Sequence, residues 1–233
     1  MGLTVSKKTI IYIDGYNLYY SRLKNTPFKW LDVVALFRDQ ILMPQDPTAE
    51  VVAVKYFTAP VMASYARHGA DSANAQTQYL RALTAKHECI EVINGFHIFE
   101  HTALPAYVEG KAPDKNNLAP VWMIEEKQTD VNLSLQVLRD AIKGLCSQVV
   151  ICSNDSDVEP VLKLLASDAP DVRVGLVLPL REPGTGQQRF SNKRLTGKAD
   201  WVRHYIRNEE LAASQLPQNV PTKKKPARKP SHW

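Results

Sequence analysis

The sequence lacks long apolar runs and has few cysteines. No stretch of its 233 residues approaches the roughly 20 apolar residues that cross a bilayer, and no apolar signal segment follows the first residues. The three cysteines, Cys89, Cys146 and Cys152, lie in or beside apolar segments without metal-ligand spacing. We therefore expect buried, reduced thiols, no membrane contact and a cytoplasmic location.

Two familiar kinds of catalytic motif are also missing. His97 and His101 are four residues apart, but they fall in a predicted strand and loop, where that spacing does not bring two imidazoles together. The chain has no Gly-x-Ser-x-Gly segment, which disfavours a serine hydrolase of the α/β-hydrolase type. Zinc hydrolysis and serine hydrolysis are therefore not expected.

The positive charge is confined to the C-terminal segment. The net charge is +5, and residues 217–233 contain five basic side chains and no acidic one. Residues 1–216 keep 24 of the 29 basic side chains and all 24 acidic ones, so they are formally neutral. We predict a folded domain at 1–216 and a disordered, Pro- and Lys-rich basic tail at 217–233. The tail side chains that could bind RNA phosphates are Lys223, Lys224, Lys225, Arg228 and Lys229.

Short apolar runs alternate with helical segments along the chain. Strands are predicted at residues 9–13, 50–57, 149–152 and 172–178, and helices at 30–42, 65–86, 128–143 and 158–167. Residues 89–99 fit a strand or hairpin arm, 102–117 an irregular insertion and 121–124 a short strand. The alternation predicts an α/β domain with a central, mainly parallel sheet covered by helices on both faces.

Four aspartates lie directly after predicted strands or at the start of a predicted helix. Asp14 follows the first strand, Asp155 and Asp157 follow the strand at 149–152, and Asp130 opens a helix. In an open parallel sheet the carboxyl ends of the strands form the ligand crevice. Because gathered carboxylates repel one another and a hard cation relieves that repulsion, the pattern suggests a metal-dependent phosphoryl site.

Three sequence blocks together resemble the NYN domain family, the LabA-like branch of the PIN-like nuclease superfamily. They are Ile-Asp-Gly-Tyr-Asn at 13–17, Glu-Lys-Gln-Thr-Asp-Val at 126–131 and Ser-Asn-Asp-Ser-Asp at 153–157. The resemblance extends from about residue 8 to residue 217. Asn154 stands where the family usually has glycine, and Val158 where it usually has an aromatic residue.

The resemblance implies a PIN-like (Rossmannoid) fold and an endoribonuclease that cuts RNA with Mg²⁺ or Mn²⁺. Metal ions can neutralise phosphate oxygens and activate water for such a reaction. Under this hypothesis Asp14, Asp130 and Asp155 bind metal, and Asp157 completes the metal shell. Asn17 positions a carboxylate or phosphate, and Ser153 hydrogen-bonds Asp14 or water. Lys127 holds the substrate phosphate, and Tyr16 stacks on a base.

Other interpretations of the same residues stay open. Asp130 could serve the helix dipole alone, and Asp155 and Asp157 could be turn and N-cap residues. Glu125 and Glu126 are expected to be exposed, although one could reach the aspartates. A weak RNA-binding or partner-binding module and a metal-dependent phosphatase are the alternative functions. Assembly of identical copies is also left open.

Overall fold

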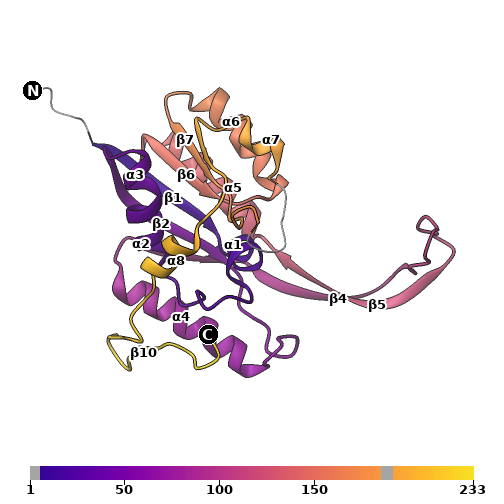
Figure 1. Cartoon of the computed structure of the whole chain (residues 1–233). Coiled ribbons are helices and arrows are strands. Elements are labelled where there is room, and N and C mark those ends of the chain that lie inside the picture. The colour runs from indigo at the N-terminus through magenta and orange to yellow at the C-terminus, as the bar shows by residue number, and fades with distance from the viewer. Residues whose placement is uncertain (1–5, 185–190) are drawn as a thin grey trace, which may run out of the picture.

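A six-stranded parallel sheet forms the centre of the protein (Figure 1). The computed structural model describes residues 6–184 and 191–233. The strands, in the order β3-β2-β1-β6-β7-β8, are β1 (Lys7–Asp14), β2 (Ala49–Thr58), β3 (Ile90–Asn94), β6 (Gln148–Cys152), β7 (Arg173–Val177) and β8 (Trp201–Arg203). Successive strands are added outward from β1 on one side and from β6 on the other. The topological switch point therefore lies between β1 and β6.

Helices cover both faces of this sheet. Ile11 and Ile13 of β1 join the core under the first helical layer, whereas Ile10 and Tyr12 join the core under the second. Successive side chains of a strand point to opposite faces, so a strand buried on both faces is a continuous apolar run. The first layer contains α1 (Gly15–Leu18), η1 (Tyr19–Leu23), α2 (Val33–Ala35), η2 (Leu36–Leu42), α4 (Ala70–Lys86) and α8 (Asn208–Ala213); the second contains α5 (Thr129–Ile142), α6 (Glu159–Asp168) and α7 (Lys193–Thr196). The predicted α/β class is confirmed.

The main differences from prediction lie at element boundaries. The segment predicted as one helix at 30–42 begins at Val33, because Asp32 accepts a hydrogen bond from the Ala35 amide as an N-cap. It continues from α2 through the π-helical η2 into α3 (Met43–Gln45). Residues 201–203, for which no strand was predicted, form strand β8 at the edge of the sheet. None of the described helices has the length and apolar character needed to cross a membrane.

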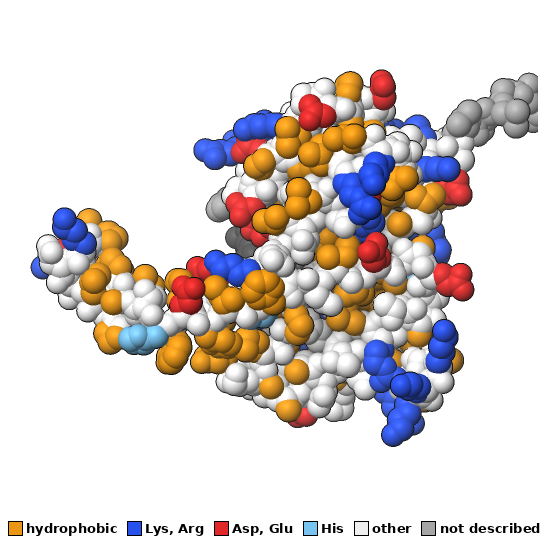
Figure 2. Space-filling model, turned by 180° about the vertical axis from the view of Figure 1, so that it is seen from behind, with side chains coloured by type: hydrophobic (Ala, Val, Ile, Leu, Met, Phe, Trp, Pro, Cys, Tyr) orange, Lys and Arg blue, Asp and Glu red, His pale blue; other side chains and the backbone are white. Residues whose placement is uncertain are grey.

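Residues 96–127 form a long antiparallel arm. β4 (Phe96–Pro105) pairs with β5 (Leu118–Lys127) along its whole length, and the pair projects away from the body (Figure 1). The insertion predicted at 102–117 is therefore partly strand, and only residues 106–117 form the connecting tip. Alternating apolar residues allow the ribbon to form, and Figure 2 shows hydrophobic side chains along it.

The C-terminal segment is ordered, which corrects the disorder predicted for residues 217–233. β9 (Asn219–Val220) pairs with β10 (Ala227–Arg228), and Val220 and Ala227 are buried in the core beside α4. The Trp30 indole N–H donates to the Pro217 carbonyl at 2.7 Å, and the Trp233 ring lies 6.2 Å from the Trp30 ring. These few apolar anchors outweigh the polar composition that suggested disorder.

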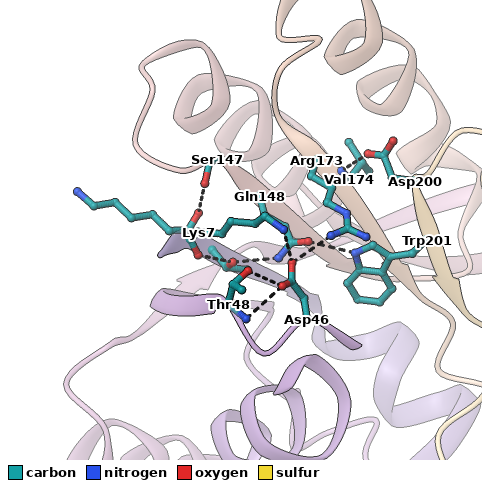
Figure 3. Close-up of polar contacts among 11 residues, drawn as sticks. Lys7, Asp46, Thr48, Ser147, Gln148, Arg173, Val174, Asp200 and Trp201 are labelled. Carbon is teal, nitrogen blue, oxygen red and sulfur yellow. Dashed lines mark hydrogen bonds and ion pairs between the residues drawn. The ribbon is translucent and has the colours of Figure 1, made fainter. Parts of the chain in front are cut away.

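A polar network ties together the amino ends of four sheet strands, β1, β6, β7 and β8 (Figure 3). Asp46 Oδ2 accepts from Lys7 Nζ at 2.9 Å and from Arg173 at 3.0 Å. The Gln148 amide group links Thr9 to the Trp201 indole, with both distances at 3.1 Å. This network lies at the end of the sheet where the strands begin, opposite their carboxyl ends. It therefore stabilises the sheet without approaching the site described next.

Candidate acidic pocket

An acidic pocket lies at the switch point of the sheet. It has a volume of about 230 Å³, and its lining comes from the end of β1, from α1 and η1, from the β5–α5 junction and from the loop after β6. The lining residues are Asp14, Tyr16, Asn17, Tyr20, Glu126, Asp130 and Asp155. The structure thus brings together three of the four predicted aspartates from three separate segments of the chain.

Asp14 is the most buried carboxyl group of the pocket. It is 4% exposed; its Oδ1 accepts from the Asn17 amide at 2.8 Å, and its Oδ2 accepts from the Ser153 hydroxyl at 2.9 Å. Burial, reinforced by the charges of Asp130 and Asp155, raises the pKa of Asp14 to about 7, although both hydrogen bonds oppose that rise. Asp14 therefore exchanges a proton near neutral pH.

The loop after β6 is held against the end of β1. Ser153 Oγ accepts from the Asp155 amide at 3.0 Å while it donates to Asp14, and Asn17 Oδ1 accepts from the Asn154 amide at 3.1 Å. The expected contact of Ser153 with Asp14 is confirmed. Asp155 Oδ1 accepts from the Asp157 amide at 3.1 Å, so Asp155 is also the N-cap of η3 (Ser156–Val158). Asp157 is exposed and does not line the pocket.

The base of the arm contributes the opposite wall. Glu126, at the end of β5, is half-buried in the pocket, and its pKa rises to about 7 through burial and the charges of Asp130 and Asp14. The pKa of Asp130 also rises, through burial and the charges of Asp155 and Asp157. The sequence interpretation expected Glu125 and Glu126 to be exposed and left open that one of them could reach the aspartates; Glu126 does so.

Two tyrosines form the aromatic side of the pocket. The Tyr16 and Tyr20 rings are stacked, with centroids 5.9 Å apart and planes inclined by 12°. The Tyr16 hydroxyl donates to the Ala59 carbonyl at 3.0 Å, which fixes its ring. Lys24 Nζ lies 4.8 Å from the centroid of the Tyr20 ring, a cation–π contact beside the pocket.

The predicted basic residues do not reach this pocket. Lys127 is exposed and forms an ion pair with Glu125 on the same strand. Lys225, Arg228 and Lys229 line a separate cavity of about 660 Å³ against α4, while Lys223 and Lys224 are exposed on the C-terminal segment. RNA binding by these residues stays a prediction.

The metal centre predicted at the aspartates is not visible as a preformed cluster in the part of the chain that the structure describes. Among residues 6–184 and 191–233, no group of three or more His, Cys, Asp or Glu side chains is arranged to hold a metal ion. Both oxygens of Asp14 and one oxygen of Asp155 accept hydrogen bonds from nearby chain segments. Binding of Mg²⁺ or Mn²⁺ remains a prediction of the sequence alone.

A curated relative decides the family. The chain is 40% identical, over an alignment of 245 positions, to a protein of Pseudomonas putida named 6-hydroxy-3-succinoylpyridine 3-monooxygenase HspA. The alignment covers 97% of this chain and 75% of the relative. The chain belongs to the HspA family. No family model matches the sequence, so its membership of the NYN domain family stays a prediction.

Membership of the HspA family corrects the predicted function. The relative is named a monooxygenase, which points to an oxidoreductase, so the endoribonuclease prediction is wrong and the phosphatase alternative has no support. The aspartate pattern did not exclude this outcome, because carboxylates at strand ends are suited to proton transfer as well as to metal binding. A crystal structure of a protein of unknown function from Vibrio parahaemolyticus shares the fold, with a TM-score of 0.50 and 18% identity; the similarity covers 90% of this chain and 98% of that one.

Proposed function

We propose that this member of the HspA family is a monooxygenase that hydroxylates a small heteroaromatic ring of the hydroxypyridine class. The observation that carries the proposal is the 40% identity to a pyridine monooxygenase over nearly the whole chain. In such a reaction one oxygen atom of O₂ enters the ring. With two electrons and two protons, the other oxygen atom leaves as water.

The acidic pocket is matched to a single flat ring. Its volume of about 230 Å³ lies below the roughly 300–1,000 Å³ of pockets that enclose drug-sized ligands. The stacked pair formed by Tyr16 and Tyr20 offers an aromatic surface on one side, and offset stacking of rings is favourable. A hydroxypyridine ring therefore has a plausible position beside these tyrosines.

The carboxyl groups of the pocket supply proton transfer. Asp14 and Glu126 both have a pKa of about 7, which is near the optimum for a general acid or base at neutral pH. Deprotonating a ring hydroxyl makes the ring more electron-rich and more reactive toward an oxygen electrophile. We assign this role to the more accessible Glu126. The charge of the buried Asp14 helps to raise the pKa of Glu126.

The same charges orient the substrate. An anionic side chain on the ring is repelled by Asp130, Asp155 and the other carboxyl groups, so the ring enters the pocket and the anionic chain stays outside. Lys24, beside Tyr20, is positioned to bind that chain. Exchange of Lys24 for glutamine should therefore raise KM for an anionic substrate more than it lowers kcat.

The pocket does not fit a nucleotide cofactor. Among the described residues that line the pocket none is cationic and able to hold a phosphate group, and the pocket volume is small for a flavin or a nicotinamide dinucleotide. The two electrons therefore come from a reductant that acts from outside this pocket.

The test is hydroxylation of an acyl-substituted hydroxypyridine by the full chain, with a reduced nicotinamide dinucleotide and with or without added flavin. Substrate-dependent O₂ uptake and a hydroxylated product are expected, and Glu126→Gln should lower kcat at least about tenfold. Asp157→Asn, outside the pocket, is the matched control. Absence of product, together with absence of substrate binding by calorimetry, would contradict the proposal.

A further inference from the structure

A second cavity, of about 660 Å³, lies between α4 and the C-terminal segment, and we call it the C-terminal cavity. One wall is a single face of α4, whose lining residues recur at intervals of three and four: Asp71, Asn74, Gln78 and Arg81. The other wall comes from the stretch 225–232. The volume lies within the roughly 300–1,000 Å³ of pockets that enclose small molecules. The cavity shares no lining residue with the acidic pocket, so its ligand is independent of the reaction proposed above.

Hydrogen bonds between the two walls fix the shape of the C-terminal cavity. Arg81 Nη2 donates to the Lys225 carbonyl at 2.6 Å, and the Arg228 amide donates to Gln78 Oε1 at 3.4 Å. The Thr222 hydroxyl donates to the same Lys225 carbonyl at 2.7 Å. These bonds engage the backbone of the C-terminal segment rather than its cationic side chains. A ligand therefore meets two walls that are already in position, and binding orders less of the chain.

The C-terminal cavity carries a surplus of positive charge. Among the described residues that line it, only Asp71 is acidic, and four are cationic: Arg81, Lys225, Arg228 and Lys229. With histidine counted as neutral, the formal surplus is three positive charges. In the part of the chain that the structure describes, none of the four cations forms an ion pair with a carboxylate. Figure 2 shows Lys and Arg side chains gathered at the lower right, where the C-terminal segment lies.

A neighbouring lysine responds to this charge. Lys29 lies beside the cavity, where its Nζ donates to the His232 carbonyl at 3.3 Å. Partial burial and the charge of Lys229 lower the pKa of Lys29. The repulsion between these two lysines reflects positive charge that the protein itself does not neutralise, and an anion bound in the cavity would relieve it.

We propose that the C-terminal cavity binds a small molecule that carries a diphosphate group. A phosphate monoester carries about −1.5 to −2 charges at neutral pH, so one phosphate leaves part of the surplus unneutralised, whereas two adjacent phosphates match it. The planar guanidinium groups of Arg81 and Arg228 suit phosphate oxygens, and the lysines add point charges. Pro226, Pro230 and His232 line the rest of this wall and can contact the organic part of the ligand.

Titration calorimetry tests the ligand class. The full chain, in a buffer that contains a chelator, should bind adenosine diphosphate at one site per chain. Inorganic pyrophosphate should displace it, because the phosphate groups are what the cations recognise, and succinate at the same concentration should not. Absence of adenosine diphosphate binding, or displacement by succinate as readily as by pyrophosphate, would overturn the proposal.

Two matched double variants test the position of the site. Lys225→Gln with Lys229→Gln removes two charges from the cavity and keeps the backbone bonds of the segment, so it should weaken adenosine diphosphate binding at least ~10-fold. Lys223→Gln with Lys224→Gln removes the same charge from exposed positions outside the cavity and should weaken it less than about threefold. Melting curves check that both variants are folded. Equal weakening in the two variants would indicate diffuse attraction to the C-terminal segment, as for a nucleic acid, and would overturn the proposal.

Discussion

The Ser153 hydroxyl donates a hydrogen bond to Asp14 Oδ2 at 2.9 Å, joining residues 139 positions apart in the sequence. The bond connects the ends of β1 and β6, the two strands on either side of the topological switch point. Ser153 also accepts from the Asp155 amide. One buried hydroxyl therefore fixes both the deepest carboxyl group of the pocket and the loop that carries another.

Removal of this hydroxyl should destabilise the protein in a pH-dependent manner. In Ser153→Ala, Asp14 loses a donor to its ionised form, so its pKa should rise further and unfolding free energy should fall by about 1–3 kcal/mol. Urea denaturation should show a larger loss at pH 8 than at pH 5. Ser156→Ala, at an exposed serine in the same loop, should have little effect. An equal loss at both pH values would argue that the bond does not stabilise the ionised form.

Asp14 itself should make stability fall as pH rises. Its pKa is about 7 in the folded protein and 3.8 in the reference state, so the folded chain retains a proton that the unfolded chain has released. The resulting stabilisation is complete below about pH 4 and is lost as pH rises through 7, over a range of roughly 4 kcal/mol.

Asp14→Asn removes this titration and keeps a side-chain oxygen for the Asn17 amide. The variant should gain stability relative to wild type between pH 5 and pH 8, measured by urea denaturation in the presence of a chelator. Asp157→Asn, at an exposed aspartate outside the pocket, should follow the wild-type curve. A wild-type curve that rises over this interval would contradict the assigned pKa.

The opposite pH dependence is expected at Asp46. Burial acts to raise its pKa, but hydrogen bonds from Thr48 and Lys7 outweigh that effect and lower the pKa to about 2. The stabilisation is therefore present above the unfolded value of 3.8 and is lost as pH falls through about 2.

Asp46→Asn should lower the melting temperature at pH 7 because Lys7 and Arg173 lose their shared ion-pair partner. A loss of about 1–3 kcal/mol is expected. Asp39→Asn removes only an exposed pair with Arg38 and should cost less than about 1 kcal/mol. Equal losses in the two variants would show that the network of Figure 3 is not a stabilising element.

The last residue should contribute to stability. Trp233 lies 5.7 Å from Tyr79 and 6.2 Å from Trp30, measured between ring centroids. Trp233→Ala should lower the unfolding free energy by about 1–2 kcal/mol and alter the near-ultraviolet circular dichroism. Trp122→Ala, at a 63% exposed position on the arm, should leave the melting curve unchanged. A silent Trp233 variant would mean that the C-terminal segment is not anchored by this ring.

The sequence by itself determined the α/β class and the positions of the central strands, because a strand buried on both faces must be a continuous apolar run. It also located Asp14, Asp130 and Asp155, since strand ends and helix starts can be read from the local pattern. It did not reveal that the C-terminal segment is ordered. There, Val220, Ala227 and Trp233 pack against core residues that are distant in the sequence, and this packing outweighs the polar composition of the segment.

Tertiary structure decided the chemistry of the pocket. Only the packing of the arm against the switch point brings Glu126 beside Asp130 and Asp14. Burial, reinforced by the charges of neighbouring carboxyl groups, raises the pKa of Asp14 and Glu126 to about 7. Desolvation and charge repulsion depend on distances between segments that are far apart in the chain, and a linear pattern does not contain those distances. The same pattern of aspartates was therefore compatible with metal binding and with proton transfer.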